Sequence, residues 1–559
     1  MNRLLLPLGA LVTLAFSLLH GSPFLLPILL LSVSLLGFIP LPRGREAFLE
    51  RAGRLLNQTF SYILPLVTLG IVLFYGWLWG ARAFGFQPVV HDEFAYLFQA
   101  ETFAAGRISY PPPPAPEFFD AFHILTEPVY ASKYPPGHAL VLAAGVLLGA
   151  PWLVVLLSVG VSLVLLGHLA RPCLGAPGAL ALVLFFGLSP AEIQTATTYL
   201  SQNTFLLAAL GTLCLFRRGA REARLLPLFL TGASLGYALL IRPFNGALLG
   251  ALLLLLALSG GSGARRLLRP RPLAIFLLPL LLMGGAGVAY NRGITGSALT
   301  APWSLYSERT HPEDTLGFAK GPIAHREVGP GKRMWIDRVF RPNYEKYTPR
   351  FAAEVLFRFR LPATILEAMP VALLVLLPGL FARGGSAYRR AALFAAAAIV
   401  LWNAGYFFYW STWVRYYHEV TPALLFLPLL GARVLVRGGR GPALAAVLLV
   451  LVALVPAADR LSSQIAFRSL KASELGRFRA RIERTVPEGS IVFIRYGPRH
   501  NPDLDLIDNE PDLSKAPRIF VYDHGAEQDR RFVEEHFPGR KPWFYDEGKR
   551  RLVPGIGES

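Results

Sequence analysis

The chain has 559 residues, of which 53% are hydrophobic and only 16% charged, and its mean hydropathy is +0.44. Because a soluble globular protein carries about 25% charged residues, this composition excludes an ordinary soluble fold. The apolar runs are about 17–20 residues long, which is the length that a helix needs to cross about 30 Å of hydrocarbon. The sequence therefore predicts an all-α polytopic membrane protein.

Thirteen apolar spans follow one another along the chain. They cover 4–20, 23–41, 61–83, 151–170, 177–190, 199–216, 225–241, 244–260, 272–290, 362–381, 391–410, 419–436 and 442–458. The first two follow each other without a small-residue cleavage site, so an uncleaved hairpin is expected rather than a signal peptide. The segment 137–148 is too short to span and ends at Gly149-Ala150-Pro151, so we expect a re-entrant or interfacial segment, although whether 138–150 crosses is left open.

The formal net charge of +19 indicates orientation rather than a nucleic-acid partner. Segment 459–559 contains 18 basic and 17 acidic residues, so the excess belongs to the membrane part. There it lies in short loops at 217–224, 264–272, 383–390 and 433–440. Short basic loops mark the cytoplasmic side, which predicts a cytoplasmic N-terminus.

Two cysteines are too few for a disulfide framework or a cysteine zinc cluster.

Under this topology three long segments, 84–136, 293–361 and 459–559, share the outer face. Loops of this length are usually functional or disordered, and the aromatic residues, prolines and paired charges in the first two segments favour function. The last contains strand-like runs at 491–496, 518–525 and 543–546 and an amphipathic run at 529–537, which predict a small extracytoplasmic α/β domain. The expected division is an N-terminal transmembrane hairpin with a cytoplasmic linker (1–60), a catalytic transmembrane module (61–458) and this domain (459–559).

The first outer loop has charged residues at both of its ends. Asp92 and Glu93 stand at its start, where a partly desolvated carboxylate is suited to act as a general base. The alternative is a helix start, in which the same charges face the first-turn amides. At the end of the loop, Lys133 precedes Tyr134 and a Pro-Pro pair. Its ammonium is suited either to bind a phosphate or to snorkel at the interface, and both readings stay open.

This order of motifs resembles the GT-C fold glycosyltransferases, specifically the dolichyl-phosphate-mannose protein mannosyltransferase-like and aminoarabinose-transferase-like group. The resemblance extends over about 61–440 and includes the segments 197–218, 236–249 and 413–430. Gln202-Asn203 stands where many members have an acid, and the tail does not resemble the β-trefoil insert of the eukaryotic enzymes. The resemblance implies a polyprenyl-phosphate sugar donor and transfer with inversion at the non-cytoplasmic face.

The resemblance, together with the residue chemistry, assigns roles to ten positions. The hexose or pentose would pass to a glycan, lipid or protein acceptor, and polyprenyl phosphate is a good leaving group only where fixed cations meet its charge. Asp92 and Glu93 are the expected catalytic residues, Lys133, Arg242 and Arg415 the expected donor-phosphate ligands, and His91, Tyr134, His138, Tyr416 and Asn203 the expected substrate-binding residues.

We expect transfer without a metal cofactor, although a divalent metal is left possible. His91, Asp92 and Glu93 offer suitable ligand atoms, but consecutive helix positions diverge by about 100°, so all three cannot easily meet one ion. A transporter or flippase of lipid-linked sugars is the alternative function, because it also needs outer-face cations but no base. The Leu/Ala/Arg-rich composition and the lack of eukaryotic inserts favour a bacterial cytoplasmic (inner) membrane.

Overall fold

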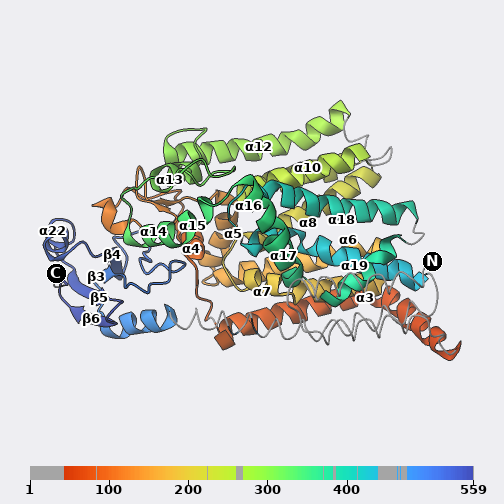
Figure 1. Ribbon diagram of the computed structural model, residues 1–559, viewed down its shortest axis with the longest axis horizontal. Helices are drawn as coiled ribbons and strands as arrows, with labels where there is room; N and C mark the ends of the chain where they lie inside the picture. Colours follow the sequence, from red (N-terminus) through yellow and green to blue (C-terminus); the bar gives the residue numbers. More distant parts are fainter. Residues whose placement is uncertain are drawn as a thin grey trace.

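The computed structural model describes residues 43–83, 85–222, 224–259, 269–368, 371–381, 385–411, 413–437, 463, 466 and 475–557. The chain is mostly helical, and long helices run side by side along the long axis of the molecule while a four-stranded sheet lies at one end (Figure 1). The predicted spans 4–20, 23–41 and 442–458 lie outside the described residues. The count of thirteen crossings therefore stays a prediction.

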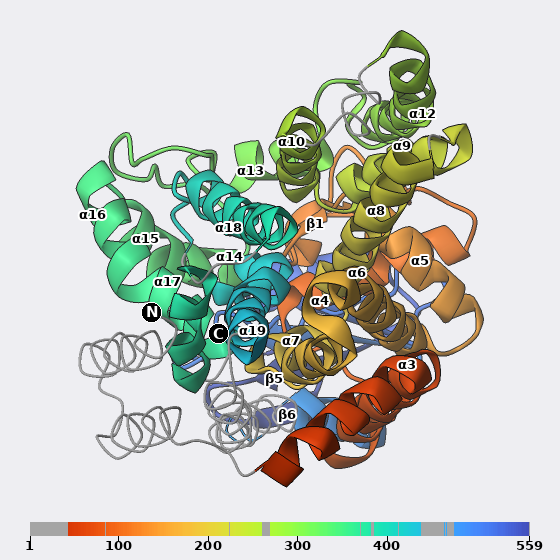
Figure 2. The same ribbon diagram turned by 90° about the vertical axis from the view of Figure 1, so that its right-hand side faces the viewer.

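The long apolar helices form a bundle, seen end-on in Figure 2. Its helices are α3 (Arg43–Trp77), α6 (Pro151–Gly187), α8 (Gln202–Glu222), α9 (Leu225–Ile241), α10 (Pro243–Ser259), α12 (Pro270–Thr295), α17 (Leu361–Ala368), α18 (Ser386–Tyr406) and α19 (Thr421–Arg437). Shorter elements accompany them: the helix α7 (Pro190–Ala196), the π-helix η2 (Leu78–Ala83), and the 3₁₀-helices η7 (Val371–Phe381) and η8 (Val414–Val420).

Among the described residues, four helical stretches are long and apolar enough to cross a membrane. They are Gly53–Gly80, Pro151–Gly187, Pro270–Thr295 and Val414–Leu435. Large apolar side chains on the outer helices face away from the protein, for example Leu66 on α3 and Leu281 on α12, which are 66% and 69% exposed. Lipid rather than water suits such surfaces, so the chain is an integral membrane protein.

Helix α6 is a hairpin of two helices rather than one rod. Gly175 adopts φ 72° and ψ 176°, which breaks the helix between Pro172 and Pro177. A Cβ on Gly187 would lie 3.3 Å from Leu163 Cδ1, so positions twelve residues to either side of Gly175 are neighbours. The chain therefore reverses at Gly175, in agreement with the two spans predicted at 151–170 and 177–190.

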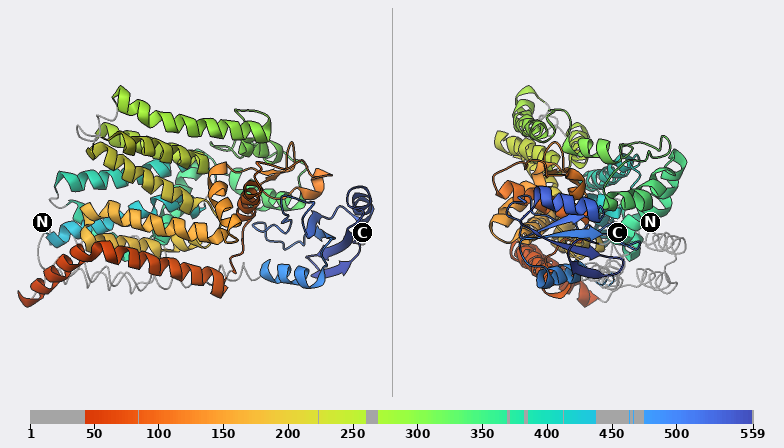
Figure 3. Two further views of the ribbon diagram at one scale, coloured as in Figure 1. Left: turned by 180° about the vertical axis from the view of Figure 1, so that it is seen from behind. Right: turned by 90° about the vertical axis from the view of Figure 1, so that its left-hand side faces the viewer.

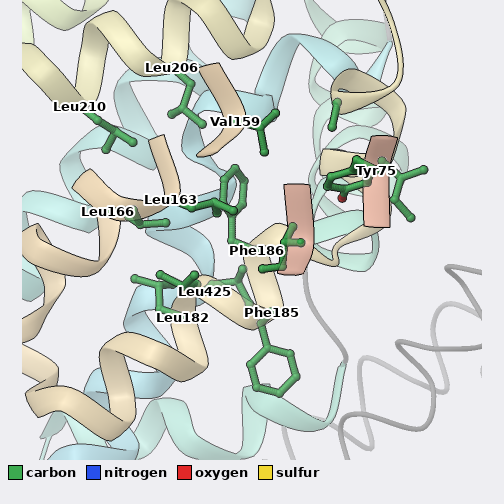
Figure 4. Packing of buried hydrophobic residues seen from close by; sticks show 14 of the residues in the cluster. Tyr75, Val159, Leu163, Leu166, Leu182, Phe185, Phe186, Leu206, Leu210 and Leu425 are labelled. Carbon is green, nitrogen blue, oxygen red and sulfur yellow. The ribbon is translucent and has the colours of Figure 1, made fainter. Parts of the chain in front are cut away.

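The main apolar core lies where this hairpin packs against α3, α8 and α19. Figure 4 shows Leu163 and Leu166 from its first half beside Leu182 and Phe186 from its second half. Tyr75 of α3 closes the core by donating a hydrogen bond of 2.6 Å to the carbonyl oxygen of Gly187. This core fixes the bundle that carries the candidate site at its sheet-proximal end.

The two predicted outer loops fold into short elements between the bundle and the sheet, as the views in Figures 1 and 3 agree. The first loop and the apolar segment after it form α4 (His91–Ala104), η3 (Pro116–Phe119), β1 (Ile124–Leu125), β2 (Ala131–Ser132) and α5 (Pro136–Leu147). The second loop forms α13 (Pro302–Thr310), α14 (Pro330–Trp335), η5 (Ile336–Phe340), α15 (Arg341–Tyr344), α16 (Pro349–Glu354) and η6 (Val355–Arg360).

The tail contains strands at the three predicted places and one strand more. The strands are β3 (Ser490–Arg495), β4 (Arg518–Tyr522), β5 (Lys541–Asp546) and β6 (Arg551–Pro554), and α22 (Ala526–His536) precedes β5. The sheet order is β4-β3-β5-β6, with β3 parallel to both β4 and β5 and with β6 antiparallel to β5. Phe118 and Phe119 of the first outer loop pack into the sheet core, so these two parts are joined by apolar contacts.

The described start of the chain differs from the prediction. Helix α3 begins at Arg43, so the stretch 43–60, which was expected as a basic linker, is helical. Its run of Arg, Glu, Ala and Leu consists of strong helix formers, and this propensity extends the helix beyond its apolar part. Hydropathy alone marks only the apolar part.

Candidate active site

The first turn of α4 presents Asp92 to a cluster of polar side chains. The hydroxyl of Tyr134 donates a hydrogen bond of 2.5 Å to Asp92 Oδ1. On the other oxygen, Arg415 Nη2 lies 3.5 Å and His91 Nδ1 lies 3.4 Å from Oδ2. The cluster therefore unites the two ends of the first outer loop with the start of η8, which lies 323 positions further along the chain than Asp92.

These neighbours keep the Asp92 carboxylate ionised. Burial opposes ionisation, but the guanidinium of Arg415, His91 and the hydrogen bond from Tyr134 outweigh it and lower the pKa of Asp92 to about 2. A carboxylate with such a pKa is charged at every physiological pH. It is also a weak base for as long as Arg415 pairs with it.

His123 is a member of the cluster that the sequence analysis missed. Its Nε2 lies 3.8 Å from Asp92 Oδ1, and its ring centroid lies 4.5 Å from that of His91. Burial lowers the pKa of both imidazoles, and Lys133 lowers that of His123 further, so both are neutral at pH 7. One ligand atom from each of His91, Asp92 and His123 lies within 4.8 Å of the other two, which makes these three residues candidate metal ligands within the described residues.

Lys133 is buried behind this cluster. Its Nζ lies 4.7 Å from the ring centroid of Tyr306 and 5.4 Å from that of Tyr134, which is the tyrosine bonded to Asp92. Burial lowers the pKa of Lys133 to about 8, and the negative charges of Asp314 and Asp92 oppose that effect. The ammonium is therefore largely charged at neutral pH and is suited to meet an anion.

A second lysine shares the Tyr306 ring with Lys133. Lys332 Nζ also lies 4.7 Å from that centroid, and it forms an ion pair of 2.5 Å with Asp120 Oδ1. Beyond Asp120 a cavity of about 850 Å³ opens between the two outer loops and the tail. Arg309, Thr310 and Arg333 are among its polar lining residues.

Arg242 joins the site from the turn between α9 and α10. Its Nε lies 3.6 Å from Glu419 Oε1, and its guanidinium carbon lies 5.9 Å from the ring centroid of Tyr416, the neighbour of Arg415. The structure thus gathers the three predicted phosphate ligands around Asp92 and Tyr416. It also places Glu419 beside Arg242, where it neutralises part of the cationic charge.

Comparison with known proteins supports the predicted resemblance in the centre of the chain. Residues 133–284 match the family model described as dolichyl-phosphate-mannose-protein mannosyltransferase. This match confirms the resemblance over the segment that contains Lys133, Tyr134, His138, Asn203 and Arg242. No curated protein shows significant similarity in sequence.

Two solved structures match the chain at low sequence identity and at a TM-score below 0.5. ArnT from Cupriavidus metallidurans, in a crystal structure bound to undecaprenyl phosphate, is 14% identical, and the match covers 86% of this chain and 92% of that chain at a TM-score of 0.47. The apo oligosaccharyltransferase of Archaeoglobus fulgidus is 12% identical, with 73% of this chain and 56% of that chain covered at a TM-score of 0.43.

Glu93 is held away from this chemistry by main-chain hydrogen bonds. It is fully buried, its Oε1 accepts a hydrogen bond of 3.1 Å from the amide of Val89, and its Oε2 accepts one of 2.9 Å from the amide of Tyr199. Both oxygens are thus engaged in joining α4 to the segment before α8. This geometry is that of a positioning residue.

His138 also belongs to a separate network. It is fully buried in α5, with Nδ1 2.9 Å from Thr204 Oγ1 and Nε2 2.8 Å from the carbonyl oxygen of Tyr199. Its ring meets Tyr96 edge-on at 4.8 Å between centroids, and Tyr96 in turn stacks on Tyr134. His138 therefore supports the site through two aromatic rings.

Asn203 takes part in a third network inside the bundle. With its amide nitrogen facing Glu192, it donates a hydrogen bond of 3.0 Å to Glu192 Oε1. The other oxygen of Glu192 lies 2.6 Å from His418 Nε2, and all three side chains are buried. The acid that many members of the resembled family have near position 203 is replaced here by an amide that binds the nearby Glu192.

Sequence reasoning found the charged ends of the first loop and several partners of Asp92, but it missed other residues of the site. His123 and Lys332 stand in none of the motifs that carry the resemblance, and Glu419 lies in the segment 413–430 but was assigned no role there. Only the fold brings these residues to Asp92, Tyr306 and Arg242, respectively. Tyr306 lies in the aromatic run 303–335 of the second outer loop, whose composition suits carbohydrate contacts. The aromatic composition of this run was the feature of the sequence from which a role for Tyr306 could have been predicted.

Proposed function

We propose that the chain is a membrane glycosyltransferase that moves a hexose or pentose from a polyprenyl-phosphate donor to an acceptor hydroxyl, with inversion, at the outer face of a bacterial cytoplasmic membrane. One observation carries the proposal: an ionised carboxylate, Asp92, lies beside a hydrogen-bond donor and a group of fixed cations at one end of an apolar bundle. The family-model match at residues 133–284 supports it.

The residues suit a single in-line displacement. Asp92 accepts the proton of the acceptor hydroxyl as that oxygen attacks the anomeric carbon. The bond between this carbon and the phosphate oxygen breaks, and its electron pair leaves with the polyprenyl phosphate. Lys133, Arg242 and Arg415 meet the negative charge that develops there, and such preorganised charge contributes several kcal/mol in a water-poor site.

Arg415 links donor binding to the strength of the base. In the described structure it pairs with Asp92 and holds the pKa of that carboxyl at about 2. A donor phosphate that draws the guanidinium away removes this charge from Asp92, and the pKa of the carboxyl then rises toward its ordinary value. Asp92 thus becomes a better base only when the donor is in place.

The remaining predicted residues support the site in this scheme. Tyr134 orients the Asp92 carboxylate, and the ring of Tyr416 contacts the guanidinium of Arg242. Glu93, whose oxygens are occupied by backbone amides, positions α4 and does not contact the acceptor. The acceptor, which is a glycan, a lipid or a protein, enters through the cavity beside Asp120.

A flippase of lipid-linked sugars is the alternative that the cations alone would also allow. The test reconstitutes the chain in proteoliposomes with radiolabelled undecaprenyl-phosphate hexoses and pentoses and an envelope glycolipid extract as acceptor. A transferase forms labelled product and free undecaprenyl phosphate in equal amounts. Movement of intact donor between leaflets with no product from any sugar would overturn the proposal in favour of the flippase.

A further inference from the structure

We infer that His91, Asp92 and His123 form a binding site for one zinc-like divalent cation at the edge of the candidate active site. The three residues offer two imidazoles and one carboxylate, and their ligand atoms lie within 4.8 Å of one another. Two nitrogens and one oxygen with an open fourth position form the donor set of catalytic zinc sites, whereas magnesium and calcium prefer oxygen ligands alone.

The hydrogen bonding of His123 is the first observation that points to a ligand. Its side chain is buried, and neither ring nitrogen has a hydrogen-bond partner in the part of the chain that the structure describes. His91 Nδ1 is likewise buried without such a partner. A buried polar group without a hydrogen-bond partner costs about 1–3 kcal/mol of folding free energy. A cation bound by the ring nitrogens of His91 and His123 would remove this cost.

The backbone of His123 is the second, independent observation. His123 adopts φ 61°, in the left-handed region that non-glycine residues rarely occupy. Its main chain is fixed in this conformation from both sides, because its amide donates to Tyr306 Oη at 3.1 Å and its carbonyl oxygen accepts from the amide of Lys133 at 2.9 Å. Strain of this kind persists where the surroundings impose it, and it collects at functional sites.

The spacing of the ligand atoms fits one ion. Zinc lies about 2.0–2.2 Å from nitrogen and carboxylate ligands, so two ligands of a tetrahedral ion are about 3.3 Å apart. His91 Nδ1 lies 3.4 Å from Asp92 Oδ2, and His123 Nε2 lies 3.8 Å from Asp92 Oδ1. The separations among the three ligand atoms reach at most 4.8 Å, so side-chain rotations that move these atoms by about 1 Å would bring them to bonding distance of one ion.

Neighbouring rings hold the two imidazoles in place. The ring of His91 stacks on Phe122 at 4.5 Å between centroids, and that of His123 lies 5.5 Å from Tyr134 and 5.8 Å from Tyr306. Asp92 is the most accessible of the three ligands, with 20% of its side chain exposed against 6% for His91 and 7% for His123. Arg415 and Lys133 are nearby positive charges that weaken the affinity, which predicts a micromolar rather than a nanomolar site.

The role of the ion, unlike its binding, rests on the proposed function. A divalent cation at this position would bind the acceptor hydroxyl as a Lewis acid and lower its pKa. Asp92 could then accept the proton in spite of its own low pKa. From their sequence spacing, His91, Asp92 and Glu93 were not expected to share one ion easily. Both oxygens of Glu93 accept from backbone amides, and His123 offers a third ligand from the same loop.

The test is metal binding by the full chain in detergent or nanodiscs, without donor. The purified protein is stripped with a chelator and titrated with Zn²⁺ by calorimetry and with Co²⁺ by visible absorption, which reports the number and type of ligands. We expect one Zn²⁺ per chain, at least tenfold weaker binding in His91→Ala and in His123→Ala, and wild-type binding in His325→Ala, a control that removes an exposed histidine of the second outer loop. His123→Gln, which keeps a polar side chain of similar size, is a second variant in case His123→Ala does not fold.

Two results would overturn the metal site. The first is Zn²⁺ binding that is equal in the wild type and in the His91→Ala/His123→Ala double variant. The second is unchanged Zn²⁺ binding in His123→Ala together with a raised KM for the donor, which would show that the imidazoles bind sugar hydroxyls. A chain that transfers sugar but binds no Zn²⁺ here refutes this inference alone, whereas one that binds Zn²⁺ and transfers no sugar refutes the proposed function alone.

Discussion

Asp92 owes its properties to side chains from three separate parts of the chain. His91 is its neighbour in sequence, His123 and Tyr134 come from the far side of the first outer loop, and Arg415 begins the last described long helical stretch. Asp92, Tyr134 and Arg415 were predicted from the sequence, because they stand in motifs that resemble those of the GT-C glycosyltransferases. It could not identify His123, because only the fold of the loop brings that residue back to the start of α4.

Removal of the Tyr134 hydroxyl tests the orientation of the base. The hydrogen bond of 2.5 Å to Asp92 is made to a charged group, and such bonds contribute about 1.5–3 kcal/mol. We expect Tyr134→Phe to lower kcat about tenfold or more and to leave the donor KM nearly unchanged. Tyr290→Phe, which loses a bond of 2.7 Å to the neutral Gln99, is the matched control and should keep full activity. Equal activity of the two variants would contradict the role of Tyr134.

Replacement of Glu93 separates positioning from catalysis. In Glu93→Gln an amide group faces one of the two backbone N–H donors that the carboxylate now satisfies, at a cost of about 1–3 kcal/mol. We expect a lower Tm and a nearly normal kcat per folded molecule. Glu354→Gln, which breaks only an exposed pair with Arg358, should change neither quantity. An unchanged Tm with a hundredfold loss of kcat would instead make Glu93 a catalytic residue.

At the scale of elements, hydropathy located the apolar helices well. The span predicted at 225–241 coincides with α9, and Arg242, expected in a short hairpin, is the residue at which α9 ends and α10 begins. The tail strands were located by their apolar alternation. The predicted start of α3 was wrong because the first turns of this helix form through residue propensity rather than through an apolar face. Strand β6 was missed because it is a short edge strand of only four residues.

The reversal inside α6 depends on a conformation that glycine alone adopts easily. Gly175 has φ 72° and ψ 176°, so a Cβ there is strained, by about 1–3 kcal/mol. We expect Gly175→Ala to lower the Tm of the detergent-solubilised protein. Gly285→Ala in α12 is the matched control, because a Cβ there meets no atom within 4 Å, and alanine is the better helix former by about 0.5–1 kcal/mol. A Tm that is the same in both variants would show that the hairpin does not depend on Gly175.

At the scale of the whole molecule, the tail and the first outer loop form one unit around the site. The carbonyl oxygen of Asp503 accepts from the amide of His91 at 3.2 Å, and Asp505 Oδ2 accepts from the amide of Phe122 at 2.7 Å. Phe94 and Phe98 of α4 share an apolar cluster with tail residues. The tail thus fixes the backbone of His91, before Asp92, and of Phe122, before His123. Sequence patterns could not predict these contacts, because each one joins positions several hundred residues apart.

The same interface should make stability depend on pH. Burial raises the pKa of Glu101 on α4 to about 8, and the charges of Asp508 and Glu510 add to this effect. Because this folded-state pKa exceeds the ordinary value of 4.5, the protonated carboxyl favours the folded state, and its contribution is complete below pH 4.5 and is lost as pH rises toward 8. We expect the Tm of the wild type to fall across this range more steeply than that of Glu101→Gln.

A charge on the tail surface provides the control for this experiment. Glu527→Gln removes a carboxylate that pairs with Arg531 on the exposed face of α22, away from α4. The Tm of Glu527→Gln should equal the Tm of the wild type at every pH. If Glu101→Gln also follows the wild type, then burial and the tail carboxylates do not raise the pKa of Glu101 in the folded protein.

The central claim is that Asp92 removes the acceptor proton while the cations hold the donor, and single-turnover transfer by the donor-loaded chain tests it most directly. The rate constant for sugar transfer and the Kd for undecaprenyl-phosphate sugar are measured for the wild type, for Asp92→Asn and for Asp512→Asn, a surface control that loses a pair with Lys515. We predict that Asp92→Asn is about 10²–10⁴-fold slower, the usual contribution of a general base, with donor affinity kept within a few-fold. Transfer by Asp92→Asn at the wild-type rate would contradict the account.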